Sequence, residues 1–195
     1  MNRDHDGQIA IVGMACVYAG AANLRQYWRN IINGVDAIGP LPEGRWAGSQ
    51  HHDYPADHGS HLQTQRGGFI PTPYRFDPMR YKVMPNVARH GDADQFVLLD
   101  TVADALADAG IADEAEVRHR TDLIVGRGGY ASSKTVELFM RVEGIERTLE
   151  FLRQSGGVID ERTQQQLSQQ MRATLGPLHV DALASCIPNF AASRA

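Results

Sequence analysis

Two short apolar runs, far apart in the chain, constrain its fold more than any other feature. The first is "QIAIVGMAC", Gln8 to Cys16, and the second is "TDLIVG", Thr121 to Gly126. Each is rich in β-branched residues and contains or ends at a glycine, which is typical of strands buried on both faces of a parallel sheet. Helical patterns stand between them, so the order strand, helix, helix, strand predicts an α/β domain.

Two amphipathic helices are predicted between these runs. In "NLRQYWRNIINGVDAI", Asn23 is the N-cap candidate and Gly34 is a natural stop. In "DADQFVLLDTVADALADAGI", Asp92 with Gln95 three residues later resembles a capping box, and Gly110 closes the helix. The residues predicted to share an apolar face are Leu24, Tyr27, Trp28, Ile31 and Ile32 in the first helix and Phe96, Leu99, Ala103 and Leu106 in the second.

Residues 132–176 are predicted to form a helical hairpin. Steps of four and three predict one apolar seam in its first helix, and Gly156 and Gly157 end that helix. The second helix starts on Asp160 and carries a thinner apolar stripe. The seam consists of Leu138, Val142, Ile145, Leu149 and Leu152, and the stripe of Leu167, Met171 and Leu175.

Residues 34–86 show no sustained period and are rich in Pro, Gly, His and aromatic residues. We predict a long irregular loop there. A loop of this length is usually functional or packed against something larger.

Length and composition indicate one soluble domain with a real core: 195 residues, 43% of them hydrophobic, with a net charge of −4. There is no long basic block, so neither nucleic acid nor an anionic membrane is the expected partner. No apolar run approaches the roughly 18 residues that span a bilayer, and the first residues lack a secretion signal. Two distant cysteines make no disulfide framework, which favours a cytoplasmic location.

Two glycine-bearing turns resemble phosphate-binding loops only loosely. Gly13 and Gly20 follow the first apolar run but are seven residues apart, so a structural turn is favoured over nucleotide binding. The stretch "GRGGYASS", Gly126 to Ser133, could present backbone N–H groups to an anion or simply allow close packing, and packing is favoured. It is not a P-loop, because Lys134 follows two serines.

A histidine-rich segment, "HHDYPADHGSH", combines ligand types that zinc accepts. Its spacing matches no zinc pattern, so a solvated loop is favoured over a metal site. The residues concerned are His51, His52, His58 and His61, with Asp53 and Asp57.

The cysteines are the candidate nucleophiles. Cys16 ends a predicted buried strand, where cysteine acts as a small hydrophobe. Cys186 is the better candidate, because it precedes a predicted helix N-terminus, with Pro188 in the first turn, and such a position lowers a thiol pKa. No base or oxyanion donor surrounds Cys186 in the sequence, and nothing pairs His90 with either cysteine, so His90 is expected in a capping or surface role.

Several of these stretches, in this order, resemble the N-terminal part of a β-ketoacyl synthase (ketosynthase) domain of an iterative type I polyketide or polyunsaturated fatty acid synthase. The segments that carry the resemblance are "IAIVGMACVYAGAANLRQYWRNIINGVDAI", "LPEGRW", "RGGFI", "FDPMRYKVMPNVARHGDADQFVLLDTVADALADAGI" and "IPNFAASRA". The hairpin after "VGRGGY" is similar to the enediyne-like branch. Asp92, Ala93 and Asp94 depart from the D-P-Q of many relatives, which affects helix capping or dimer contacts more than chemistry.

The resemblance implies a thiolase-like fold, in which two similar α/β halves make a layered αβαβα body. We expect this chain to supply most of the first half, truncated, with the hairpin inserted. In that family an acyl group passes from the phosphopantetheine of an acyl carrier protein to a cysteine. A malonyl unit is then decarboxylated and attacks the acyl thioester.

The family's catalytic cysteine, two histidines and lysine follow the segment matched by "IPNFAASRA". The resemblance therefore assigns no catalytic, cofactor-binding or metal-binding residue within 1–195, and Cys186 is expected to be structural. We expect the isolated chain to be inactive and to bind no metal or nucleotide. Expected partners are an acyl carrier protein, the C-terminal remainder of the ketosynthase and a second copy. The alternative is a non-catalytic ketosynthase-like scaffold or chain-length partner subunit.

Overall fold

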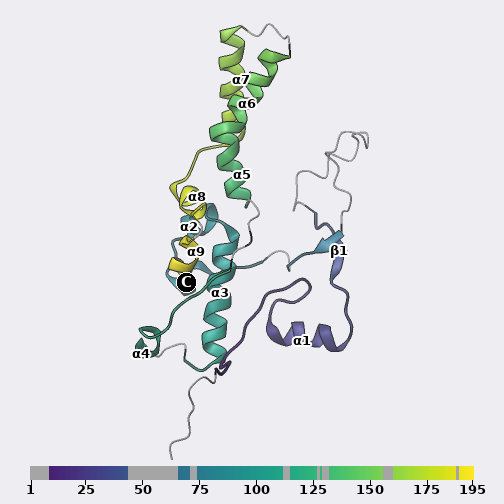
Figure 1. Cartoon of the computed structure of the whole chain (residues 1–195), viewed down its shortest axis with the longest axis vertical. Coiled ribbons are helices and arrows are strands. Elements are labelled where there is room, and N and C mark those ends of the chain that lie inside the picture. The colour runs from purple at the N-terminus through teal and green to yellow at the C-terminus, as the bar shows by residue number, and fades with distance from the viewer. Residues whose placement is uncertain are drawn as a thin grey trace, which may run out of the picture. The chain divides into compact units, whose positions relative to one another are not determined.

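The computed structural model describes residues 9–43, 66–70, 74–111, 115–126, 128, 132–155, 160–187 and 189–195. The chain divides into two compact units. The first consists of Met1–Phe76 with Asp100–Arg120, and the second of Asp77–Leu99 with Thr121–Ala195. Figure 1 labels the elements of both.

The first unit contains short helices and one small sheet. Its elements are α1 (Leu24–Ile32), β1 (Ile38–Pro40), β2 (Arg66–Gly68), the part of α3 (Ala93–Asp108) from Asp100 onward, and α4 (Ala115–Arg118). β1 and β2 pair antiparallel, with Gly39 opposite Gly67. The predicted cap of α1 is confirmed, because the Asn23 side chain accepts a hydrogen bond from the Gln26 N–H at 2.9 Å. Gly34, just past the helix, has φ +60°, which glycine adopts without strain.

The two strands predicted from apolar runs are wrong for the described residues, because 9–17 and 121–126 form no strand. A strand needs a neighbour that completes its hydrogen-bond ladder, and the described chain sets none beside either run. Ile9, Ile11 and Ile124 are accordingly 97%, 80% and 93% exposed. Both runs keep the composition of buried strands without the pairing that would bury them.

Most helices belong to the second unit. Its elements are η3 (Pro78–Tyr81), α2 (Pro85–His90), the start of α3, α5 (Ser133–Phe139), η4 (Met140–Gly144), α6 (Ile145–Gln154), α7 (Glu161–Thr174), α8 (Val180–Ser185) and α9 (Phe190–Arg194). α8 contacts α2, α5 and α9, and α6 lies along α7 (Figure 1). Among the described residues of this unit, the buried side chains are those of Gln95, Phe96, Leu99, Ile145, Leu149, Ala182 and Ala191, with Asp92.

The stretch predicted as a long irregular loop, 34–86, contains only short elements where it is described. These are β1, β2, η3 and the first residues of α2. Residues 44–65 and 71–73 lie outside the described part of the chain.

The helices of the hairpin follow the predicted ranges closely. α7 starts after Asp160, whose side chain accepts a hydrogen bond from the Thr163 N–H at 2.7 Å, as predicted. Gly156 and Gly157, the predicted stop of the preceding helix, lie outside the described residues, and α6 ends at Gln154.

The predicted seam of the first hairpin helix is wrong at Val142. Ile145 and Leu149 are buried, but Val142 is 66% exposed. The cause is η4, a π-helical turn over Met140–Gly144. Its i→i+5 hydrogen bonds place one extra residue in the turn. The side chains after the turn are therefore rotated about the helix axis by about 100° relative to their positions in a regular α-helix. A regular 3.6-residue period cannot anticipate that shift.

No helix within the described ranges is both long enough and apolar enough to cross a membrane.

Candidate functional site

A cavity of about 590 Å³ lies beside the first apolar run, within the first unit. It is bounded by the run itself, by α1 and by the C-terminal turns of α3. The residues that give it chemical character are Cys16, Asn23, Arg25, Trp28, Asp104 and Asp108. The Met14 N–H donates to the Asp108 carboxylate at 2.9 Å and so joins the run to α3.

Gly13 packs tightly against α3. This contact decides whether the glycine turn is structural or binds a nucleotide. A Cβ at position 13 would lie 2.4 Å from the carbonyl oxygen of Ala105 and 2.8 Å from the Cβ of Ala109. Gly13 is therefore needed for close approach of run and helix, not for approach to a phosphate. Gly20 has φ +66° and serves the turn before α1. The structural interpretation of this glycine turn is supported.

The Cys16 thiol lines the cavity but is not activated. It is half-buried, and burial raises its pKa above the ordinary value of 9.0. A raised pKa reduces the thiolate fraction at neutral pH, and the thiolate is the nucleophile. Cys16 was expected to end a buried strand, but residues 9–17 form no strand and the thiol lines a cavity with charged side chains, so its role as a small hydrophobe stays a prediction.

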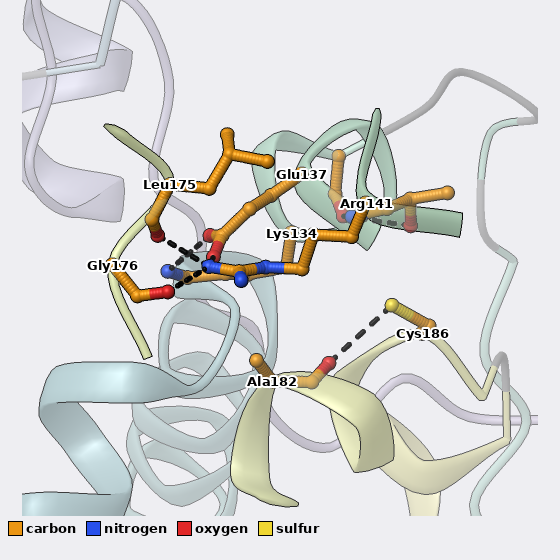
Figure 2. A network of polar contacts seen from close by, with 9 residues as sticks. Lys134, Glu137, Arg141, Leu175, Gly176, Ala182 and Cys186 are labelled. Atoms are coloured by element: carbon orange, nitrogen blue, oxygen red, sulfur yellow. Dashed lines mark hydrogen bonds and ion pairs between the residues drawn. The ribbon is translucent and has the colours of Figure 1, made fainter. Parts of the chain in front are cut away.

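The helix predicted after Cys186 is present, but Cys186 is not at its N-terminus. α9 starts at Phe190, with Asn189 as its N-cap, and Cys186 itself forms the C-cap of α8. Its thiol donates to the carbonyl oxygen of Ala182 at 3.3 Å, one turn earlier in the same helix (Figure 2). Pro188 lies outside the described residues.

His90 makes local structural contacts. Its Nδ1 lies 2.9 Å from the Asn86 carbonyl oxygen, four residues earlier in α2. Its ring stacks on that of His179, the N-cap residue of α8, with centroids 3.4 Å apart. These contacts agree with the capping or surface role predicted for His90.

A polar cluster at the base of the hairpin was not anticipated from the sequence (Figure 2). Arg141 donates to Glu137 at 3.0 Å, to the Leu175 carbonyl, and to the Gly176 carbonyl at 2.8 Å. Lys134 lies 3.2 Å from the other Glu137 oxygen. The spacing of Glu137 and Arg141 is a recognisable i,i+4 pair, but the carbonyl partners lie more than thirty residues away and have no sequence signal.

The Glu137 carboxyl takes its electrostatic character from this cluster. Burial raises its pKa, but hydrogen bonds and charge from Arg141 and Lys134 outweigh burial, so the net pKa lies below the ordinary 4.5. The Glu137 carboxylate, held ionised between two cations, is suited to stabilising the contact between helices. It is not suited to donating or accepting protons near neutral pH.

The remaining predicted sites lie mostly outside the described residues. This holds for the histidine segment 51–61 and for residues 127 and 129–131 of the second glycine-rich stretch. Within the described part of the chain, no group of three or more His, Cys, Asp or Glu side chains is arranged to hold a metal ion.

Comparison with known proteins establishes the family. Residues 6–185 match the family model of the β-ketoacyl synthase, N-terminal domain, so the chain belongs to that family. Membership confirms the predicted family and fold class, the first half of a thiolase-like α/β fold.

Similar proteins are large synthases. The chain is 30% identical over 132 residues to polyketide synthase PksN of Bacillus subtilis, which covers 66% of the chain and 2% of that protein. It is 30% identical over 128 residues to a polyunsaturated fatty acid synthase of a Thraustochytrium species, which covers 66% of the chain and 4% of that protein. The chain thus spans only a few per cent of the length of these relatives.

A solved structure is similar over part of the chain. The oxazolomycin ketosynthase domain OzmH KS7 of Streptomyces albus JA3453 is 33% identical, with a TM-score of 0.46. The match covers 50% of this chain and 17% of that one.

Proposed function

We propose that this chain is the N-terminal part of a condensing enzyme that joins acyl and malonyl thioesters by decarboxylative Claisen condensation in polyketide or fatty acid biosynthesis. The observation that carries the proposal is the family match over residues 6–185. The likeness to both polyketide and polyunsaturated fatty acid synthases supports the same reaction class.

The described residues supply scaffold and not chemistry in this proposal. The Cys16 thiol has a raised pKa, and Cys186 is fixed at a helix C-terminus. Acyl transfer needs a thiolate beside a base or cation, with donors for the oxyanion. We therefore propose that the chain alone does not accept an acyl group.

The partners follow from the same reaction. An acyl carrier protein would deliver both substrates on its phosphopantetheine arm, and the C-terminal remainder of the ketosynthase would supply the cysteine, histidines and lysine. The chain itself would need no metal or nucleotide. We also propose a cytoplasmic, dimeric synthase of the enediyne-like branch.

Intact-mass spectrometry tests the inactivity of the isolated chain. The purified chain is incubated with an acyl-pantetheine thioester, and its mass is compared with that of a Cys16→Ala, Cys186→Ala variant treated in the same way. We expect no acyl adduct on either protein. An adduct on the unmodified chain that the double variant lacks would contradict the proposal.

A non-catalytic scaffold or chain-length partner subunit is the alternative, and reading the coding sequence past Ala195 separates the two. A cysteine in a small-residue turn followed by two histidine motifs in the same frame supports the condensing enzyme. A frame that lacks them supports the scaffold.

A further inference from the structure

The end of α1 places an asparagine directly before a glycine. Asn33 is the C-cap residue of α1, Gly34 follows it, and both are exposed. Because glycine has no Cβ, no side chain at position 34 hinders the approach of its backbone nitrogen to the Asn33 side chain. The five other asparagines of the chain each precede a larger residue; they are Asn2, Asn23, Asn30, Asn86 and Asn189.

The Asn33 side chain differs from those of its two neighbours on α1. The Asn23 side chain caps the helix by accepting from the Gln26 N–H, and the Asn30 side-chain amide donates to the Gly20 carbonyl at 3.0 Å. Within the described part of the chain, the Asn33 amide has no hydrogen-bond partner. Its carbon Cγ is therefore accessible to a nucleophile from the main chain.

The nucleophile at this position is the backbone nitrogen of Gly34. It forms a bond to Cγ of Asn33, the bond between Cγ and Nδ2 breaks, and ammonia leaves with the proton of the Gly34 N–H. The product is a five-membered succinimide ring. Water then opens the ring at either of its two carbonyls, which leaves aspartate or isoaspartate at position 33. The reaction consumes only water and needs no oxidant or cofactor.

The turn that ends α1 opposes this reaction in the folded chain. The Gly34 N–H donates to the Ile31 carbonyl at 3.1 Å. The Val35 N–H donates to the Asn30 carbonyl at 2.9 Å, which completes a Schellman motif around Gly34. The ψ angle of Asn33 is 3°, so the Gly34 nitrogen eclipses the Asn33 nitrogen and points away from the Asn33 side chain. The ring can close only after ψ rotates, and that rotation breaks both hydrogen bonds.

We propose that Asn33 is a site of spontaneous deamidation, and that opening of this Schellman turn sets the rate in the folded protein. Only molecules with the turn open can bring the Gly34 nitrogen to Cγ, so the rate is proportional to their fraction. The change is irreversible. In the isoaspartate product the main chain passes through Cγ and is one methylene group longer, so the turn loses its two hydrogen bonds. The new carboxylate also lies at the C-terminal end of α1, where the partial charge is negative.

Peptide mapping by mass spectrometry after incubation in mildly alkaline buffer with urea tests the site. We expect Asn33 to convert at least about tenfold faster than Asn86, a difference of about 1.4 kcal/mol in activation free energy. Gly34→Ala should remove this advantage, and urea makes the comparison independent of folding. Asp6 also precedes a glycine, but isomerisation of an aspartate leaves the mass unchanged, so a mass gain reports asparagine alone. Equal rates at Asn33 and Asn86 would overturn the proposal.

Hydrogen exchange tests the control by the turn. Without urea, Asn33 should convert more slowly by the same factor by which the Gly34 amide is protected from exchange, because both processes need the same opening. A synthetic peptide of residues 30–37, measured in both solvents, corrects for the effect of urea on the reaction itself. Agreement of the two factors supports the proposal. A conversion as fast in the folded chain as in urea, or a slowing unrelated to the Gly34 protection, contradicts the role of the turn.

Discussion

The guanidinium of Arg141 donates to the carbonyl oxygen of Gly176 at 2.8 Å, across 35 positions of sequence. Arg141 belongs to the π turn in the first helix of the hairpin, and Gly176 follows the end of the second. The contact thus closes the hairpin at its base, and the Leu175 carbonyl is bound by the same nitrogen. Carbonyls at a helix end have no partner within the helix, so Arg141 satisfies groups that would otherwise need water.

Replacing Arg141 by alanine should destabilise the second unit by about 2–3 kcal/mol. The side chain is only 13% exposed, and its loss leaves Glu137 and two carbonyls without their shared donor. Urea unfolding followed by circular dichroism measures the change. Lysine at this position should recover part of the loss, because all three acceptors are bound by a single guanidinium nitrogen and an ammonium nitrogen also carries several donors.

The matched control for Arg141 is Arg147→Ala. Arg147 pairs with Glu143 at the same i,i+4 spacing but is 71% exposed. Exposed pairs of this kind contribute at most about 0.5 kcal/mol. Equal losses for the two variants would mean that the contacts to the α7 end contribute nothing.

Acid should weaken the hairpin through Glu137. Its pKa is lower in the folded protein than the ordinary 4.5, so its ionised form stabilises the fold above that pH. This contribution is lost as the pH falls through the folded pKa. Unfolding free energies measured from about pH 7 down to pH 3 should therefore decline more steeply for the natural chain than for Glu137→Gln. Parallel curves for the two proteins would rule out this role of Glu137.

The helices of this chain could be predicted from its sequence because their signals are local. Asn23 and Asp160 both cap the helices that they were predicted to start. The strands could not be predicted correctly from composition, because an apolar run becomes a strand only when a neighbour pairs with it. The π turn also escaped prediction, and it moved Val142 from the expected buried seam to the surface.

In the candidate sites too, local features could be predicted from the sequence and contacts between distant residues could not. Cys186 is predicted not to be a nucleophile, because no base or cation neighbours it in the sequence and the resemblance places the family's catalytic cysteine beyond it; the structure adds that Cys186 caps the end of α8. The Arg141 cluster depends on carbonyl groups of Leu175 and Gly176, which any residue type would supply. Contacts made by backbone atoms of distant residues leave no pattern in the sequence.

Alanine at Gly13 should destabilise the first unit by about 1–3 kcal/mol. The new Cβ would lie 2.4 Å from the Ala105 carbonyl oxygen, and a backbone atom of a helix cannot give way cheaply. Gly39→Ala is the control, since a Cβ there meets nothing within 4 Å and alanine costs less chain entropy than glycine. Thermal unfolding of both variants distinguishes the two positions. A Gly13→Ala protein as stable as the natural chain would show that the run does not pack against α3 as described.

Cys16 should react slowly with alkylating reagents in the folded chain. Burial raises its pKa above 9.0, so its thiolate fraction near pH 8 is smaller than that of a free cysteine. The rate of iodoacetamide addition to a Cys186→Ala variant, which has Cys16 as its single thiol, measures this directly. In denaturant the same variant should react at the rate of an unstructured cysteine peptide. Faster reaction in the folded state than in denaturant would show an activated thiol, and it would reopen Cys16 as a nucleophile for acyl transfer.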